Sequence, residues 1–67
     1  MFKFYSYEVF GKLDNDIIKF CKKNNIGCSD DGRLCYFAGE KKDLEKLHDE
    51  FFNEYEFNIE EKTLKKI

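Results

Sequence analysis

Hydrophobic and polar positions along this chain change between the period of a strand and the period of a helix. Residues 2–10 (FKFYSYEVF) are rich in aromatic side chains and lack glycine and proline, which predicts a long strand. One face of this strand carries Tyr5, Tyr7 and Val9, and the other carries Phe2, Phe4, Ser6, Glu8 and Phe10. Because Ser6 and Glu8 make the second face more polar, we expect the first face to lie toward the core.

Two segments carry apolar residues at intervals of three and four, the spacing of an amphipathic helix. The first covers residues 14–24, with Asp14 as N-cap and a buried stripe of Ile17, Phe20 and Cys21. The second covers residues 40–54 and buries Leu44, Leu47 and Phe51, with His48 and Tyr55 as further candidates. One face of each helix is expected to be exposed, because it carries lysines in the first segment and a mixture of lysines and acidic residues in the second.

Between these helices, residues 26–38 (IGCSDDGRLCYFA) predict a β-hairpin. Asp31-Gly32 suits the centre of a type I′ turn, and that turn would pair Cys28 with Cys35. Residues Ile26, Cys28, Cys35 and Phe37 then share one face, and Leu34 and Tyr36 share the other. The second strand is therefore apolar on both faces, as expected of a central strand.

After the second helix the apolar period becomes two, because Tyr55, Phe57 and Ile59 alternate with polar residues. This pattern predicts a half-buried edge strand. An alternative interpretation makes Asn58 the N-cap of a short helix over residues 59–67. Both hold together if the strand ends near Asn58 and a helical tail follows.

The predicted order is strand, helix, strand, strand, helix, strand, which indicates an α+β fold. With right-handed crossovers it closes as a ferredoxin-like βαββαβ sandwich, a four-stranded antiparallel sheet in the order 4-1-3-2 with both helices on one face. The 67 residues are expected to form a single domain, 1–67. Strands one and three, the most apolar on both faces, take the two central places.

The amino-acid composition narrows the possible class of protein and its cellular compartment. Eight Phe and four Tyr enlarge a core that a chain of this length could otherwise barely build. The net charge of −2 is unlike that of a general nucleic-acid binder. Three Cys, no signal-peptide pattern and no long apolar run predict a cytoplasmic protein without a membrane span, in which Cys28 and Cys35 are buried thiols rather than a disulfide.

The residues that could carry chemistry do not form a familiar constellation. Cys21, Cys28, Cys35 and His48 are ligand types for zinc, but no C-x2-C spacing joins them, so we expect no metal and no cofactor. His48 has no neighbouring nucleophile with an orienting partner. The glycine-rich phosphate loop of acylphosphatases and the C-x-x-C loop of metal-delivery domains, both found on this type of fold, are absent. We therefore expect a protein that is not an enzyme.

A sheet with helices on one face leaves its other face uncovered. The central strands would place Phe2, Phe4, Leu34 and Tyr36 together there, and a contiguous aromatic patch marks an interaction site. The leading hypothesis is a protein-interaction module that binds another protein, or a second copy of itself as a homodimer, by this face or by strand addition at an edge. The Lys-, Asn-, Phe- and Ile-rich composition suggests a phage or mobile-element protein that inhibits or redirects a host enzyme.

Two other hypotheses use different surfaces or partners. Residues 33–38 (RLCYFA) are similar to the third-strand pattern of RNA-recognition motifs, which implies single-stranded nucleic-acid binding by stacking on Phe4 and Tyr36. The glycine-rich start of that pattern, its companion on the first strand and a basic charge are missing. In the other hypothesis, the acidic surface of Glu45, Asp49 and Glu50 mimics a phosphate backbone and occupies a nucleic-acid-binding protein.

Overall fold

The computed structural model describes the backbone of residues 2–64 and the side chains of residues 4–62. In chain order the elements are β1 (Phe2–Phe10), α1 (Asn15–Lys23), β2 (Gly27–Asp30), β3 (Leu34–Gly39), α2 (Lys41–Phe51) and β4 (Ile59–Leu64). The protein is thus a small α+β fold with a four-stranded antiparallel sheet and two helices.

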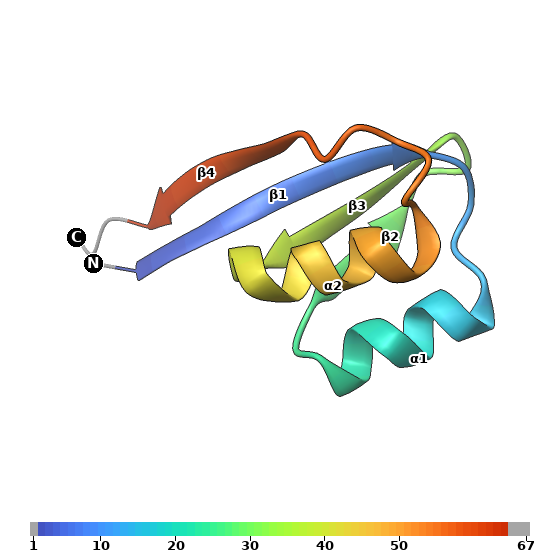
Figure 1. Cartoon of the computed structure of the whole chain (residues 1–67), viewed down its shortest axis with the longest axis horizontal. Helices are drawn as coiled ribbons and strands as arrows, with labels where there is room; N and C mark the ends of the chain where they lie inside the picture. The colour runs from blue at the N-terminus through green and yellow to red at the C-terminus, as the bar shows by residue number, and fades with distance from the viewer. Residues whose placement is uncertain (1, 65–67) are drawn as a thin grey trace.

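The sheet has the strand order β2-β3-β1-β4, and every neighbouring pair is antiparallel. Read from the other edge, this is the predicted order 4-1-3-2. Strands β1 and β3 therefore occupy the centre, as their apolar character on both faces predicts. Both helices lie below the sheet in the view of Figure 1, so the upper face of the sheet carries no helix.

The core lies between the sheet and the helices. It consists of Tyr7, Val9, Ile17, Cys21, Ile26, Cys35, Phe37, Leu44, Leu47 and Phe52. Tyr7 and Val9 come from the face of β1 that the sequence predicts to be buried, and Tyr5 packs against the same cluster. The aromatic rings carry much of this packing, because Tyr7 contacts Phe37, Phe52 and Phe57 at centroid distances of 5.5–6.2 Å.

Helix α1 begins as predicted. The carboxylate of Asp14 accepts a hydrogen bond of 2.9 Å from the backbone N–H of Ile17, which satisfies one of the free donors of the first turn. Helix α2 is shorter than predicted at its C-terminal end. It ends at Phe51, because Phe52 turns into the core and the chain then folds back through a hydrogen bond from Tyr55 N–H to the Phe52 carbonyl.

The predicted hairpin register is wrong by two residues. Cys28 pairs with Phe37 and Asp30 with Cys35, so Cys28 and Cys35 are not opposite each other. The two central residues of the turn are Gly32 and Arg33, since Asp31 N–H donates to the Leu34 carbonyl. Within the turn, Gly32 has positive φ (+91°) and Arg33 does not. That arrangement resembles a type II′ turn rather than type I′. A slip of two preserves the faces, and Cys35 and Phe37 are buried as predicted.

The C-terminal segment also differs from the prediction. Tyr55 and Phe57 precede the strand instead of forming it, and β4 begins only at Ile59, opposite Tyr7. His48 holds the preceding loop, because its Nε2 donates a 2.6 Å hydrogen bond to the Tyr55 carbonyl. The alternative helix is wrong over residues 59–64, which pair with β1; its last three residues, 65–67, lie outside the described part of the chain.

The hydroxyl of Tyr7 generates the first prediction. Its side chain is fully buried and its oxygen has no hydrogen-bond partner, so the group keeps the cost of leaving water without compensation. Tyr7→Phe is expected to leave the free energy of unfolding unchanged or to raise it by up to about 1 kcal/mol in urea denaturation. Tyr36→Phe is the matched control and should destabilise, because the Tyr36 hydroxyl donates a 2.7 Å bond to Asp31. A clear loss of stability in Tyr7→Phe would contradict this account.

The cysteines generate the second prediction. All three are free thiols, and Cys21 and Cys35 are buried. The melting temperature should be the same with and without reductant, and native labelling should modify the half-buried Cys28 first. Cys35→Ala should cost about 1 kcal/mol through lost packing, and Cys28→Ala should cost less. A melting temperature that falls with reductant, with a chain two hydrogens light by mass spectrometry, would show a disulfide instead.

Candidate functional site

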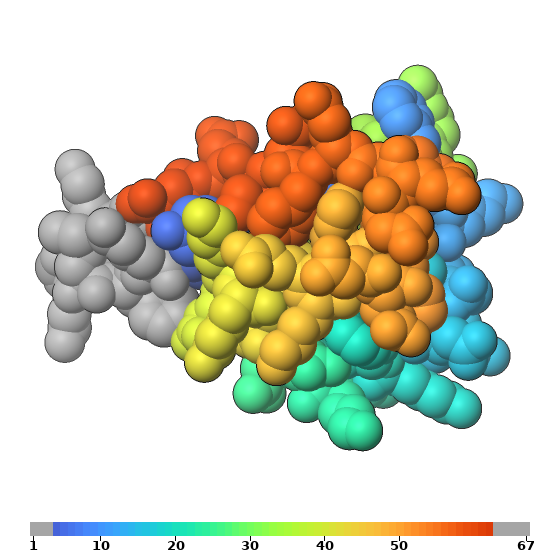
Figure 2. Space-filling model, viewed as in Figure 1, coloured from blue at the N-terminus to red at the C-terminus, as the bar shows by residue number. Residues whose placement is uncertain are grey.

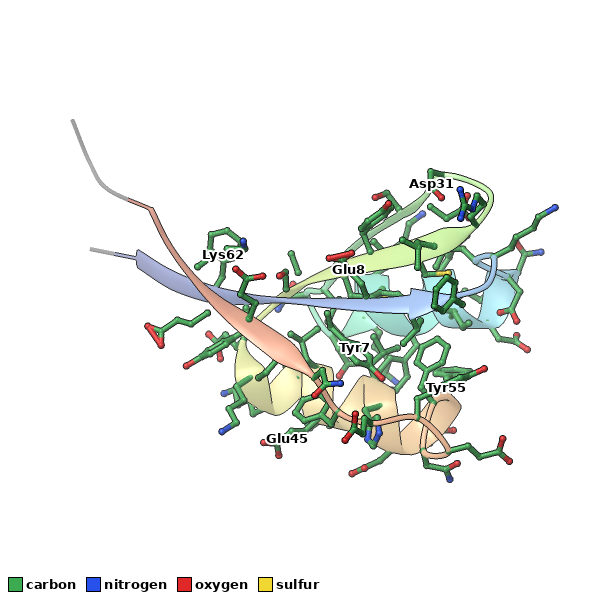
Figure 3. All side chains as sticks on the ribbon, turned by 90° about the horizontal axis from the view of Figure 1, so that it is seen from above. Tyr7, Glu8, Asp31, Glu45, Tyr55 and Lys62 are labelled. Carbon is green, nitrogen blue, oxygen red and sulfur yellow. The ribbon has the colours of Figure 1, made fainter. Side chains whose placement is uncertain are left out.

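The uncovered face of the sheet is the surface on which the sequence places its candidate site. In Figure 3 this face is seen from above, with Glu8 near the centre and Asp31 at the hairpin turn. Strand pairing places Phe4, Leu34 and Tyr36 on this face, and each is half-buried. Phe2 belongs to the same face by register, but its side chain lies outside the described residues.

Among the described side chains, the structure keeps Leu34 and Tyr36 together but separates them from Phe4. Leu34 lies opposite Phe10 and Tyr36 lies opposite Glu8, whereas Phe4 lies opposite Lys62 on β4. Glu8 follows Phe4 by four positions along β1, which is about 13 Å along a strand. The expected single patch is therefore split between two ends of the sheet, with Ser6 and Ala38 between them.

An aromatic residue that the sequence-based site omitted completes one of these ends. Phe10 is 73% exposed, more than Tyr55, the other exposed large hydrophobic residue among the described side chains. It lies beside Leu34 and diagonal to Tyr36, and these three residues are called the Phe10 corner below. Figure 2 shows atoms from the end of β1 projecting beside the hairpin. An antiparallel β3 that follows the hairpin runs back from the end of β1, which indicates this end of the sheet, but the pairing of Phe10 with Leu34 depends on contacts between distant segments.

The hairpin turn holds one side of the Phe10 corner rigid. Asp31 Oδ1 accepts hydrogen bonds of 2.9 Å from the backbone N–H groups of Arg33 and Leu34, and Oδ2 accepts the 2.7 Å bond from the Tyr36 hydroxyl. These donors, with the Leu34 N–H first, lower the pKa of Asp31. The hydrogen bond between the Tyr36 hydroxyl and Asp31 also raises the pKa of Tyr36, and the nearby charges of Asp31 and Glu8 add to this rise.

The middle of the face has small side chains and is slightly hollowed. One hollow of about 350 Å³ lies over β2 and β3, and another of about 320 Å³ lies between β1 and β4. Ser6 borders both, and Glu8 borders the second. On β4, Lys62 donates a 3.1 Å hydrogen bond to Glu60, so these two opposite charges satisfy each other.

The second predicted surface lies elsewhere. Glu45, Asp49 and Glu50 are exposed on α2, and Glu45 is labelled on that helix in Figure 3. Asp49 lies 3.4 Å from Nδ1 of His48, and lysines of the same helix are interspersed with the acids. The three residues thus lie on the helical side of the molecule, away from the open face.

The surroundings of the cysteines and of His48 are those of residues that stabilise the fold. Burial, followed by the neighbouring thiol of Cys28, raises the pKa of Cys21 to about 12, and burial also raises the pKa of Cys35. The Cys35 thiol donates to the Gly11 carbonyl at 3.3 Å. Within residues 2–64, no group of three or more His, Cys, Asp or Glu side chains is placed to hold a metal ion.

Comparison with known proteins adds no relative. The chain matches no protein-family model, no curated protein and no solved structure. Across the part that the structure describes, no helix is long and apolar enough to cross a membrane. The site must therefore be interpreted from its own geometry.

The Asp31–Tyr36 hydrogen bond generates the third prediction. The folded state lowers the pKa of Asp31 below its ordinary value of 3.8. The ionised Asp31 therefore stabilises the folded state fully above pH 3.8, and this contribution is lost as pH falls through the folded pKa. In Tyr36→Phe the Asp31 pKa should rise toward 3.8, and less stability should be lost on acidification. An NMR titration of the side-chain carboxyls measures this, with Tyr55→Phe as control. An unchanged Asp31 pKa in Tyr36→Phe would show that the hydrogen bond is absent in solution.

Proposed function

We propose that this chain is a non-enzymatic protein-interaction module that binds another protein through the Phe10 corner of its open sheet face. The observation that carries the proposal is the 73% exposure of Phe10 beside Leu34 and Tyr36 on a face without a helix. A single exposed apolar residue is ordinary, whereas one that adjoins the half-buried Leu34 and Tyr36 on a rigid sheet favours a binding surface. This replaces the patch that the sequence predicts with a more compact one at one end of it.

The non-enzymatic part of the proposal is supported by how the reactive side chains are used. A cysteine nucleophile needs a lowered pKa, yet the pKa values of Cys21 and Cys35 are raised by burial. His48 uses Nε2 to hold the Tyr55 carbonyl, which leaves that nitrogen occupied in the folded state. These groups stabilise the fold and the loop before β4.

We also propose that the fold is ferredoxin-like. The βαββαβ element order, antiparallel neighbours and the spatial order 4-1-3-2 support this assignment. Edge strands β2 and β4 offer strand addition as a second route for a partner or a second copy. A role as a phage or mobile-element inhibitor of a host enzyme stays a prediction from composition.

Phe10 and Tyr55 are the two exposed large aromatic residues among the described side chains, and they provide a matched test, which is the fourth prediction. Phe10→Ser should abolish retention of the proteins that the wild type captures from a bacterial lysate, because it removes the centre of the Phe10 corner. Tyr55→Ser removes the other exposed aromatic, 52% exposed, and should retain them. Both sites are exposed, so both variants should fold, which circular dichroism checks.

The outcomes separate the possible surfaces. Equal capture by wild type and Phe10→Ser would exclude the Phe10 corner as the binding surface. Loss in both variants would indicate a surface that extends to the helical side. If the captured material is nucleic acid and its retention falls steeply with salt, the stacking hypothesis replaces this proposal.

A further inference from the structure

Glu8 is a charged group on the open face that the fold itself does not use. It is exposed, and no hydrogen bond or ion pair joins it to another described residue. It lies directly opposite Tyr36 and two residues before Phe10 on the same face of β1. An unpaired carboxylate thus adjoins the apolar surface of the Phe10 corner.

The charges around Glu8 leave this region acidic. Asp31 lies on the Tyr36 side, while Glu60 on β4 is paired with Lys62. Arg33 in the turn is the nearby cation, but the pKa of Tyr36 responds more strongly to Asp31 and Glu8, which raise it, than to Arg33, which lowers it. Lys12 follows Gly11 and is exposed beyond the end of β1.

The shape of the face gives a long side chain a place beside Glu8. The hollow between β1 and β4 is lined by Ser6, Glu8, Asn58, Ile59 and Glu60. Its lining contains the carboxylates of Glu8 and Glu60, and no cationic side chain contributes to it. Ile59 also borders the hollow, but it lies opposite Tyr7 and its side chain packs against the core. An acidic lining of this kind matches the cationic end of Arg or Lys.

We propose that the Phe10 corner and Glu8 together bind a basic segment of a partner protein, in which Arg or Lys pairs with Glu8 and an adjacent apolar side chain contacts Phe10 and Leu34. This inference rests on the proposed function and names the chemistry of the partner. Charge complementarity selects this occupant over a second copy of the chain. Two copies joined corner to corner bring their Glu8 carboxylates onto one interface, and like charges oppose that contact.

The experiment that tests this, and the fifth prediction, uses three short synthetic peptides of equal length as probes. They are acetyl-Arg-Leu-Arg-Leu-Arg-amide, its Glu-for-Arg counterpart and its Gly-for-Leu counterpart. Titrated into ¹⁵N-labelled protein, the Arg-Leu peptide should shift the amides of Glu8, Phe10 and Tyr36. The Arg-Gly peptide should bind more weakly because it lacks apolar contacts, and the Glu-Leu peptide should not bind.

Variants then locate the charge preference. Glu8→Gln should weaken binding of the Arg-Leu peptide by up to about fivefold, the upper end of the range for an exposed ion pair. Glu8→Lys should favour the Glu-Leu peptide instead. Glu45→Gln removes the same charge from the outer side of α2 and should leave the affinity unchanged. Added salt should weaken the wild-type interaction, because the pair is exposed.

Equal binding of the acidic and basic peptides, shifts confined to α2, or no shift up to millimolar peptide would each overturn this inference. Phe10-dependent self-association in sedimentation would show that a second copy occupies the face, and Phe10-dependent binding of an oligothymidine would show a nucleic acid; both also overturn it. If the peptide preference fails while Phe10→Ser still abolishes lysate capture, only the partner chemistry is wrong. If Phe10→Ser captures normally, the proposed function itself fails.

Discussion

The packing of Tyr7 at the centre of β1 is the contact on which the rest of the molecule depends. Its buried ring contacts Phe37 from β3, Phe52 at the end of α2 and Phe57 from the loop before β4. It thereby joins β1 to β3 and to residues 52–57, two segments that are distant from it in the sequence. Each aromatic pair contributes about 0.5–1.5 kcal/mol beyond area burial, which matters in a domain too small for a large core.

The loop between α2 and β4 shows how this packing is extended. Its backbone has little regular structure, yet Phe57 packs against Tyr7 and the ring of His48 at 5.1–5.5 Å. His48 adds the hydrogen bond to the Tyr55 carbonyl, which fixes the loop to α2. The loop fixed in this way leads to the edge of the sheet, where β4 pairs with β1.

Concentrating the aromatic core beneath the sheet leaves the other face to different constraints. Both helices pack below the sheet (Figure 1), so no helix packs on the residues above it, and strand pairing and the hairpin turn help to hold them. Asp31 rigidifies that turn with three hydrogen bonds, and the exposed Phe10 lies beside it. A binding surface on such a support loses little conformational freedom when a partner is bound.

The sequence by itself determined the element order, the strand order and the buried faces of β1 and β3. Alternation along residues 2–10 and 34–38 is a local property, and a hairpin slip of two residues preserves faces because the period of a strand is two. The cap at Asp14 was equally readable, since the interaction spans only three residues.

Only the tertiary structure decided which residues meet across strands. The turn could form around Asp31-Gly32 or Gly32-Arg33, and the hydrogen bonds of Asp31 selected the second. Tyr55 and Phe57 alternate with polar residues as strand residues do. They lie in a loop instead, because Phe57 packs against Tyr7 and His48 donates a hydrogen bond to the Tyr55 carbonyl. The candidate site moved from Phe4 to Phe10 for the same reason. The register between β1 and β3 depends on contacts between distant segments, and no local pattern encodes it.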